Sequence, residues 1–399
     1  MWPKALSLYF ISYPIQWLMG VDGLLWVLLL PLGLLIFLRG NHSLLTKRDL
    51  LFMFGLLVFF LSSLLASLNI VHNYRYITWF RDTYLIATLL FVAYILAHRS
   101  RGETCKRVAY SVFSVLTFSC VAGLVSIVLG YDFKLHTAVS YVAPSFILDT
   151  DFGHRLFVKT LTSDAWFFGY DYKRLSGTFD YATSFAVALV VAIIFLISSL
   201  KTYRILRLVL FSIFLVSLFF TTSRASIISL FVGVSLLAFL GGGWGRRFLI
   251  IMLLSASILP FLYFPDLLHT IVTLRGGGSA TDRLEIYQRT WAAIRENPYG
   301  YGSQVDIPEL AYPLGSHSSW LALPFKFGIL GVFGIMLAIL SLTWFGKQKS
   351  KSYLFYAMAA SVAFMGIFEE IYLDAMTGLV VATLIGVSIA RRRRFHDFC

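Results

Sequence analysis

The chain is built from long apolar stretches separated by short polar ones. Twelve stretches of 15 to 22 mostly apolar residues are each bounded by charged or turn residues. A helix of about 20 apolar residues crosses the hydrocarbon core of a membrane. The pattern therefore predicts an all-α polytopic membrane protein with about 12 transmembrane helices. The stretches are residues 5–19, 22–38, 50–69, 78–97, 108–129, 181–200, 207–221, 226–243, 248–264, 328–345, 353–371 and 376–390.

The first stretch is the least regular. It is short and contains Pro14, and the pair Gly20 and Asp22 separates it from the next stretch. It could lie in the membrane interface instead of crossing the bilayer.

Two loops on the same side of the predicted membrane are much longer than the others. They divide the chain into five parts: transmembrane helices 1–5 in residues 1–130, a first large loop in 131–180, helices 6–9 in 181–264, a second large loop in 265–327, and helices 10–12 with a basic tail in 328–399. Loops of this length in a compact protein are usually functional or disordered. Both are rich in aromatic residues, which argues against disorder.

The composition supports a membrane protein and excludes several other classes. Of the 399 residues, 58% are hydrophobic and 13% are charged, and the mean hydropathy is +0.79. Soluble domains are nearer one quarter charged, so a soluble enzyme, a disordered chain and a secreted disulfide scaffold are excluded. The net charge of +13 does not indicate nucleic-acid binding, because no basic solvent-exposed domain is present.

The positive charge instead indicates the orientation of the chain. With both termini on the inner side, most of the 33 Lys and Arg residues fall in inner loops, including Arg391 to Arg394. Inner loops of membrane proteins are enriched in Lys and Arg. Both large loops then face the outer side, as does most of the polar chemistry. The three cysteines lie inside or within a span, so the sequence predicts no disulfide framework, and it has no Cys/His spacing of a metal site. No cofactor is predicted.

Charged residues within or beside the spans also lie near the outer side. They are Arg81, Asp82, Lys326, Glu369 and Glu370. A transporter usually carries ionisable groups at the membrane midplane. This distribution therefore favours chemistry at the outer interface.

The second large loop is predicted to contain an amphipathic surface helix. Apolar residues recur at helical spacing from Ser279 to Glu296, and the sequence from Asn297 to Gly300 ends the pattern. We expect this helix to lie over the membrane surface.

The turn between residues 221 and 226 is the strongest candidate for an anion site. Its hairpin is short, so Arg224 should lie at the depth of lipid phosphates, and Ser223 is placed to cap the next helix. An arginine beside a helix N-terminus can bind a phosphate or diphosphate bidentately. The alternative is an arginine that reaches to lipid head groups, and the residues alone favour neither interpretation.

Further arginines of the outer loops could join this site. Arg174 lies at the mouth of the sixth span, and Arg283 lies near the start of the surface helix. Arg289 and Arg295 are on the same helix but partly on other faces. For each of these arginines taken alone, a solvated position or an ion pair with a neighbouring acid remains the simpler interpretation.

His317, just before the tenth span, is the candidate general base. Histidine can accept a proton near neutral pH and can orient a hydroxyl. A single loop histidine is more often merely solvated. If His317 is not the titrating group, Glu369, Glu370 and Asp374 at the neighbouring outer turn are the next candidates.

Four stretches in order resemble the O-antigen ligase and polymerase superfamily of bacterial inner membranes. They are residues 174–179, residues 221–225, residues 283–287 followed by 297–302, and His317-Ser318 followed by Gly328 and Gly331. The resemblance covers about 170–335 by motif and the first five spans only by hydropathy. Ser318 is a departure, since many members carry Asn there.

The resemblance is closest to the ligases and implies a glycosyltransferase of the membrane-embedded C class. Such an enzyme transfers undecaprenyl diphosphate-linked O-antigen to a sugar hydroxyl of lipid A-core, with inversion and without ATP or metal. It implies an inner-membrane location with the active site periplasmic, Arg224, Arg283 and Arg174 at the donor diphosphate, and His317 as the base. An O-antigen or exopolysaccharide polymerase is the alternative. A lipid-linked glycan flippase is a more distant one.

Overall fold

The computed structural model describes residues 2–39, 46–100, 102–130, 133–142, 157–167, 170–199, 204–241, 278–310, 312–343, 353–371 and 374–391. Helices dominate, which confirms the predicted all-α class. The helices are α1 (Trp2–Met19), α2 (Asp22–Leu25), the 3-10 turn η1 (Trp26–Leu28), α3 (Leu29–Arg39), α4 (Lys47–Ser67), α5 (Arg75–Arg99), α6 (Gly102–Val128), α9 (Ala182–Ser199), α10 (Arg204–Phe220), α11 (Arg224–Gly241), α14 (Gly278–Glu296), α15 (Ser319–Thr343), α16 (Tyr353–Gly366) and α17 (Ala375–Arg391).

Every predicted apolar stretch that falls on described residues forms helix. The stretch 248–264 lies outside the described residues. By length and composition, five of the described helices could each cross a membrane, namely α4, α5, α6, α11 and α15. Shorter apolar helices accompany them, including α10, α16 and α17. The protein is thus an all-α polytopic membrane protein.

The first two apolar stretches differ from simple spans. Helix α1 packs against α6 and buries Leu6, Phe10 and Trp17, so it belongs to the bundle and does not lie outside it. The second stretch is interrupted by η1 between α2 and α3.

Helix α9 forms the centre of the bundle. Its residues from Phe185 to Leu196 are at most 1% exposed, and α6, α10, α11, α16 and α17 all contact it. A helix that is apolar on every side belongs in a protein core or a membrane, and α9 occupies the core. Beside this group, α15 packs closely along α4, and α17 packs along α5.

Short strands occur in the first large loop, where the sequence predicted no strand. Strand β1 (Lys134–His136) pairs with β2 (Val158–Thr160), and β3 (Thr162–Phe167) pairs with β4 (Tyr170–Leu175), both antiparallel. The 3-10 turn η2 (Ala138–Tyr141) follows β1. The helix predicted from Ser279 to Glu296 is present as α14, one residue longer than expected.

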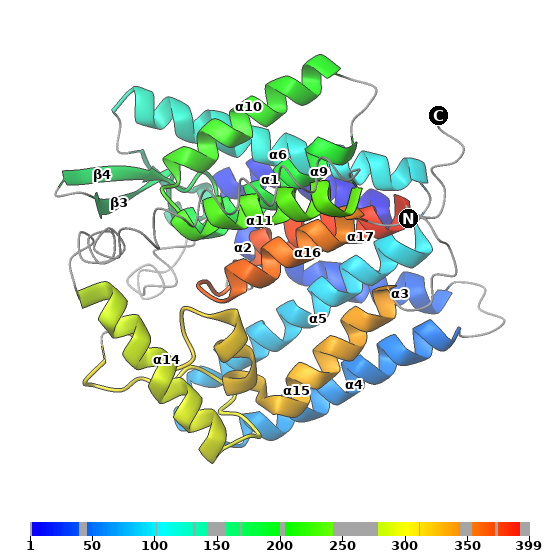
Figure 1. Ribbon diagram of the computed structural model, residues 1–399, viewed down its shortest axis with the longest axis vertical. Coiled ribbons are helices and arrows are strands. Elements are labelled where there is room, and N and C mark those ends of the chain that lie inside the picture. Colours follow the sequence, from blue (N-terminus) through cyan, green and yellow to red (C-terminus); the bar gives the residue numbers. More distant parts are fainter. Residues whose placement is uncertain are drawn as a thin grey trace.

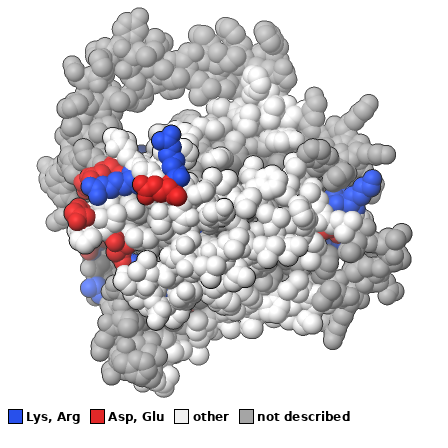
Figure 2. All heavy atoms as spheres, turned by 90° about the horizontal axis from the view of Figure 1, so that it is seen from below, with Lys and Arg blue, Asp and Glu red and all other residues white. Residues whose placement is uncertain are grey.

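The bundle has two distinct ends. Helix α14 and the β3–β4 hairpin lie at one end, which we call the loop end, and the chain begins at the opposite end (Figure 1). Seen from below, the charged side chains gather at these two ends, with an uncharged band between them (Figure 2). A charge-free band of this kind is what a bilayer requires of a lipid-facing surface.

Candidate functional site

The hairpin that carries Arg224 is held tightly at the loop end. Helix α10 ends at Phe220 and α11 begins at Arg224. Thr222 adopts a left-handed backbone conformation with φ 52°, which non-glycine residues rarely adopt. The Thr221 hydroxyl donates to the Leu218 carbonyl at 2.7 Å. The turn therefore fixes the direction in which α11 and its half-buried Arg224 begin.

Ser223 occupies the predicted N-cap position of α11. Its hydroxyl lies 2.7 Å from the Ser226 hydroxyl, and its carbonyl accepts the backbone N–H of Ile227 at 3.1 Å. Both serines are buried, so their hydroxyls are closed off from solvent, whereas Arg224 between them is half-buried.

The structure brings Arg174 to this hairpin. Arg174 lies on β4, and its Nε donates to the Thr221 carbonyl at 2.9 Å. The end of β4 is anchored in the bundle, because the N–H groups of Ser176 and Gly177 donate to the Leu161 carbonyl. The hydroxyls of Thr178 and Ser119 of α6 are 2.5 Å apart. Two of the predicted site arginines thus share one rigid turn.

Helix α14 covers the loop that carries His317. Its inner face buries Ile286, Thr290 and Ile294, which are spaced by one turn as expected for a helix with a single buried stripe. The Thr290 hydroxyl accepts the backbone N–H of Gly315 at 3.1 Å. The Tyr287 hydroxyl donates to the His317 carbonyl at 3.1 Å.

His317 is held from several sides. Its backbone is left-handed, with φ 64°, and strained residues of this kind cluster at functional sites. Its ring meets the ring of Tyr312 edge-on at 4.5 Å between centroids. The next residue, Ser318, donates to the Gly366 carbonyl at 3.2 Å. The backbone of the His317 loop is therefore held by α14 and by the end of α16.

The surroundings keep the imidazole neutral. Burial, and next the positive charge of Arg283, lower the pKa of His317 to about 4. Its Nε2 is buried and has no hydrogen-bond partner among the residues that the structure describes. A neutral imidazole nitrogen without a partner can accept a hydrogen bond from a hydroxyl.

The Arg224 hairpin and the His317 loop lie at a common level of the bundle. Ser229 of α11 and Ser361 of α16 each donate to the other's carbonyl at 2.9 Å. Arg224 precedes Ser229 by five residues, and Gly366 follows Ser361 by five, so each is about 7.5 Å further toward the loop end. Because the Gly366 carbonyl accepts the Ser318 hydroxyl, the Arg224 hairpin and the His317 loop lie at the same level of the bundle.

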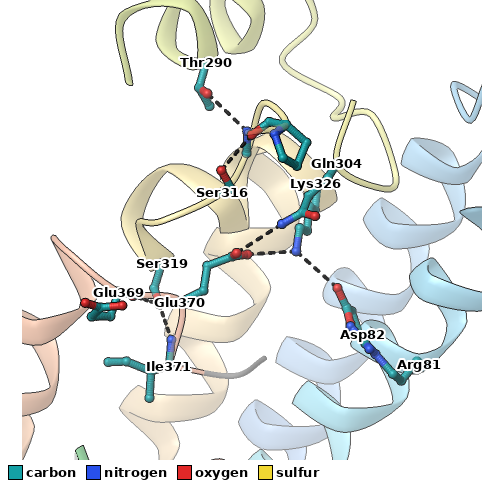
Figure 3. A network of polar contacts seen from close by, with 12 residues as sticks. Arg81, Asp82, Thr290, Gln304, Ser316, Ser319, Lys326, Glu369, Glu370 and Ile371 are labelled. Atoms are coloured by element: carbon teal, nitrogen blue, oxygen red, sulfur yellow. Dashed lines mark hydrogen bonds and ion pairs between the residues drawn. The ribbon is translucent and has the colours of Figure 1, made fainter. Parts of the chain in front are cut away.

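A buried ion network lies directly beneath the His317 loop (Figure 3). The Lys326 Nζ is 2.8 Å from Glu370 Oε1 and 3.2 Å from Asp82 Oδ2, and all three side chains are nearly fully buried. Arg81 binds the other oxygen of Asp82 at 2.7 Å. Gln304 donates to Glu370 at 3.1 Å. The network ties together α5, α15 and the segment between α16 and α17.

We expect this network to be essential for stability. Lys326→Met would leave two buried carboxylates without their shared cation, and breaking a buried pair costs about 3–5 kcal/mol. The thermal unfolding midpoint in detergent should fall strongly, whereas Glu370→Gln, which keeps a hydrogen-bond acceptor, should be milder.

The matched control is Lys173→Met. Lys173 pairs with Asp164 at 2.6 Å, but both side chains are substantially exposed, and exposed pairs contribute little. An unchanged midpoint for Lys326→Met would contradict a structural role for the network.

A comparison with protein families identifies the central region of the chain. Residues 208–336 match the family model described as O-Antigen ligase. This match supports an assignment of that region to the O-antigen ligase superfamily. The matched region runs from α10 into α15 and includes Arg224, Arg283 and His317, whereas Arg174 lies before it. No match was found among curated proteins or among solved structures.

The match implies a glycosyltransferase-like enzyme of O-antigen processing and, together with the apolar helices, a multi-pass bacterial membrane protein. In general terms, such enzymes act on lipid-linked polysaccharide and lipid A-core.

The ligase region contains a broken helix that explains two of its motifs. Helix α15 is interrupted at Gly328, which has φ 73°. The segment from Asn297 to Gly302 fills the break: Tyr301 N–H donates to the Phe325 carbonyl at 2.8 Å, and Gly302 N–H donates to the Lys326 carbonyl at 2.9 Å. The freed N–H of Ile329 donates to the Pro298 carbonyl at 2.9 Å.

Glycine is required on both sides of this contact. A Cβ on Gly328 would collide with the Tyr299 carbonyl, and a Cβ on Gly300 would collide with the Gly328 nitrogen. These glycines of the ligase motifs therefore allow two backbones to touch. The break divides α15 at Gly328. The part before the break follows the His317 loop and carries Lys326.

The remaining candidate residues have structural partners. Arg289 pairs with Glu285 at 2.6 Å, and the Arg295 guanidinium lies 6.0 Å from the ring centroid of Trp291. Asp374 caps α17, where it accepts from Met376 N–H and from the Thr377 hydroxyl. The Glu369 carbonyl accepts from Ser319. Within the described ranges, no group of three His, Cys, Asp or Glu side chains could hold a metal ion.

Proposed function

We propose that the chain is an O-antigen ligase. It transfers an undecaprenyl diphosphate-linked polysaccharide to a sugar hydroxyl of lipid A-core oligosaccharide at the periplasmic face of the bacterial inner membrane. The observation that carries the proposal is the neutral His317 at the loop end, whose buried Nε2 has no partner among the described residues and whose pKa is lowered by burial and by the charge of Arg283. The two long loops then lie in the periplasm, and both termini lie in the cytoplasm.

The reaction breaks the bond between the anomeric carbon of the donor and the diphosphate oxygen. The acceptor hydroxyl attacks that carbon from the opposite face, which inverts its configuration. His317 Nε2 accepts the hydroxyl proton, and the lipid diphosphate leaves with the bonding electrons. General base catalysis requires the base to be unprotonated, and the lowered pKa of His317 supplies this condition at neutral pH.

Negative charge grows on the diphosphate as it leaves, so cations must stabilise it. Arg224 and Arg283, with Arg174 as a third member, are assigned this role. Arginine forms two parallel hydrogen bonds with phosphate oxygens, and preorganised donors stabilise developing charge without further rearrangement. The Arg174 contact with Thr221 and the common level of α11 and the His317 loop support a shared site. Neither ATP nor a metal ion is required for this chemistry.

The test is transfer by the purified protein. It uses lipid-linked glycan, rough lipopolysaccharide and a chelator. Formation of core-linked polysaccharide supports the ligase. Extension of one lipid-linked glycan by another would instead identify a polymerase. Movement of the donor between leaflets without a new glycosidic bond would identify a flippase.

The role of Arg283 gives a separate prediction. Arg283→Gln should reduce use of the donor by roughly 10²-fold, the usual scale for loss of one stabilising donor group, and should leave the KM for the acceptor nearly unchanged. Steady-state kinetics with each substrate varied in turn measures both effects.

Arg289→Gln is the matched control for Arg283, because Arg289 lies on the same helix and pairs with Glu285. It should retain donor use. An Arg283→Gln variant in which only the acceptor KM rises would place this arginine at the acceptor sugar.

A further inference from the structure

A second candidate binding site lies at the opposite end of the bundle, between α6 and α10. The two helices are in contact near the middle of the bundle, where the ring centroids of Phe113 and Phe214 are 6.2 Å apart. From there they diverge toward their N-terminal ends (Figure 1). A pocket of about 400 Å³ lies in this region, lined by Glu103, Lys106, Arg107, Tyr110 and Leu206.

The polar lining comes from one face of α6. Residues 103, 106, 107 and 110 are three, four and seven positions apart, so they share one side of the helix. Lys106 and Arg107 are exposed and form no ion pair with any residue that the structure describes. The Tyr110 hydroxyl is buried and has no hydrogen-bond partner among those residues.

These groups together favour a phosphate. The two cations outweigh the single acid Glu103, and a guanidinium, an ammonium and a phenol supply several donors to one anion. A buried hydroxyl without a partner is unfavourable, and an anion in the pocket would provide one. None of these side chains takes part in the site at the loop end.

The surface around the pocket is suited to acyl chains. Ile205 is 81% exposed and Leu208 is 65% exposed on α10, in a chain whose bundle crosses a membrane. Leu206, from the same turn, lines the pocket itself. An occupant that contacts all of these residues has an anionic head and a long apolar tail. Basic pockets between transmembrane helices bind anionic lipid head groups in this way.

We propose that this pocket binds the headgroup phosphate of an anionic phospholipid, with its acyl chains along α10. The occupant is a lipid of the bilayer, and binding is independent of the glycosyl transfer proposed for the loop end.

The test measures lipid binding to the detergent-purified full chain by native mass spectrometry. Dioleoylphosphatidylglycerol should bind, and dioleoylphosphatidylcholine should bind far more weakly. The double variant Lys106→Gln, Arg107→Gln should weaken phosphatidylglycerol binding by about 30-fold, because each cation near an anionic membrane surface contributes roughly one factor of five. Tyr110→Phe should weaken it by a smaller factor.

The matched control is the double variant Lys4→Gln, Lys47→Gln. It removes the same charge from exposed positions of α1 and α4 and should bind as the wild type does. Equal loss in both double variants would show that binding depends only on net charge and would overturn the proposal. Inorganic phosphate at millimolar concentration should not displace the lipid. Full displacement would show that the pocket takes free phosphate and would overturn the lipid assignment.

Discussion

Arg224→Ala should abolish glycosyl transfer while the protein still inserts and folds. Arg224 begins α11 directly after a turn fixed by the left-handed Thr222 and by the contact from Arg174 to Thr221. The substitution removes the cation that we assign to the leaving diphosphate. It leaves this turn and the reciprocal Ser229–Ser361 bonds in place. Loss of a preorganised hydrogen-bond donor costs ~10²- to 10³-fold in kcat. A guanidinium that forms two hydrogen bonds with the diphosphate should give a loss at the upper end of this range.

The lysine variant separates this role from a contact with lipid head groups. Lysine keeps the charge but cannot form two parallel hydrogen bonds. Arg224→Lys should therefore also be poor in the transfer assay. The control Arg295→Lys changes an arginine that lies over Trp291 and should be nearly neutral. Near-normal transfer by Arg224→Lys would favour the head-group interpretation.

Much of the fold was accessible from hydrophobicity alone. Apolar stretches of membrane length must form helices because the bilayer offers no other partner for backbone groups. The prediction failed where polar residues interrupt a helix. The tenth span was expected to begin at residue 328, but α15 begins at Ser319 and is broken at Gly328. The first half of α15 was not recognised as helix, because it contains Pro324 and Lys326 and neither residue type is usual in a membrane span.

The residue types of the candidate site could be predicted from the sequence, but the contacts between those residues could not. Arg174 contacts the hairpin of Arg224 through the Thr221 carbonyl. The buried network was missed, although its members were recognised as unusual charges, because Lys326 and Asp82 are 244 residues apart. Pairing over such a distance leaves no local pattern. The assignment of Arg224, Arg283, Arg174 and His317 to catalysis stays a prediction.

His317→Ala should reduce the transfer rate by ~10²- to 10⁴-fold, the usual contribution of positioned proton transfer, while donor binding persists. The ring makes one edge-on contact with Tyr312. The loop is held mainly through backbone groups of Gly315 and His317. The substitution should therefore leave the loop in place. Equilibrium binding of the donor and single-turnover transfer measure the two effects separately.

The pH dependence gives the sharper test of His317. Only the neutral imidazole can accept a proton, and its pKa is lowered to about 4. In the wild type, kcat/KM should stay level as the pH falls from 7 and should decline only as it passes about 4. Arg283→Gln removes a cation that lowers this pKa, so the acid limb should move to higher pH. It should stay below the ordinary imidazole value of about 6.5, because burial is the larger cause.

Two further results would decide between His317 and the neighbouring acids. Arg289→Gln, whose arginine already pairs with Glu285, should leave the acid limb where it is in the wild type. Burial, together with the nearby Asp180, raises the pKa of Asp374 to about 7, so an acid limb near neutral pH would indicate Asp374. If His317→Ala keeps the wild-type limb, the titrating group lies elsewhere, and Asp374, Glu369 and Glu370 are the residues to replace next.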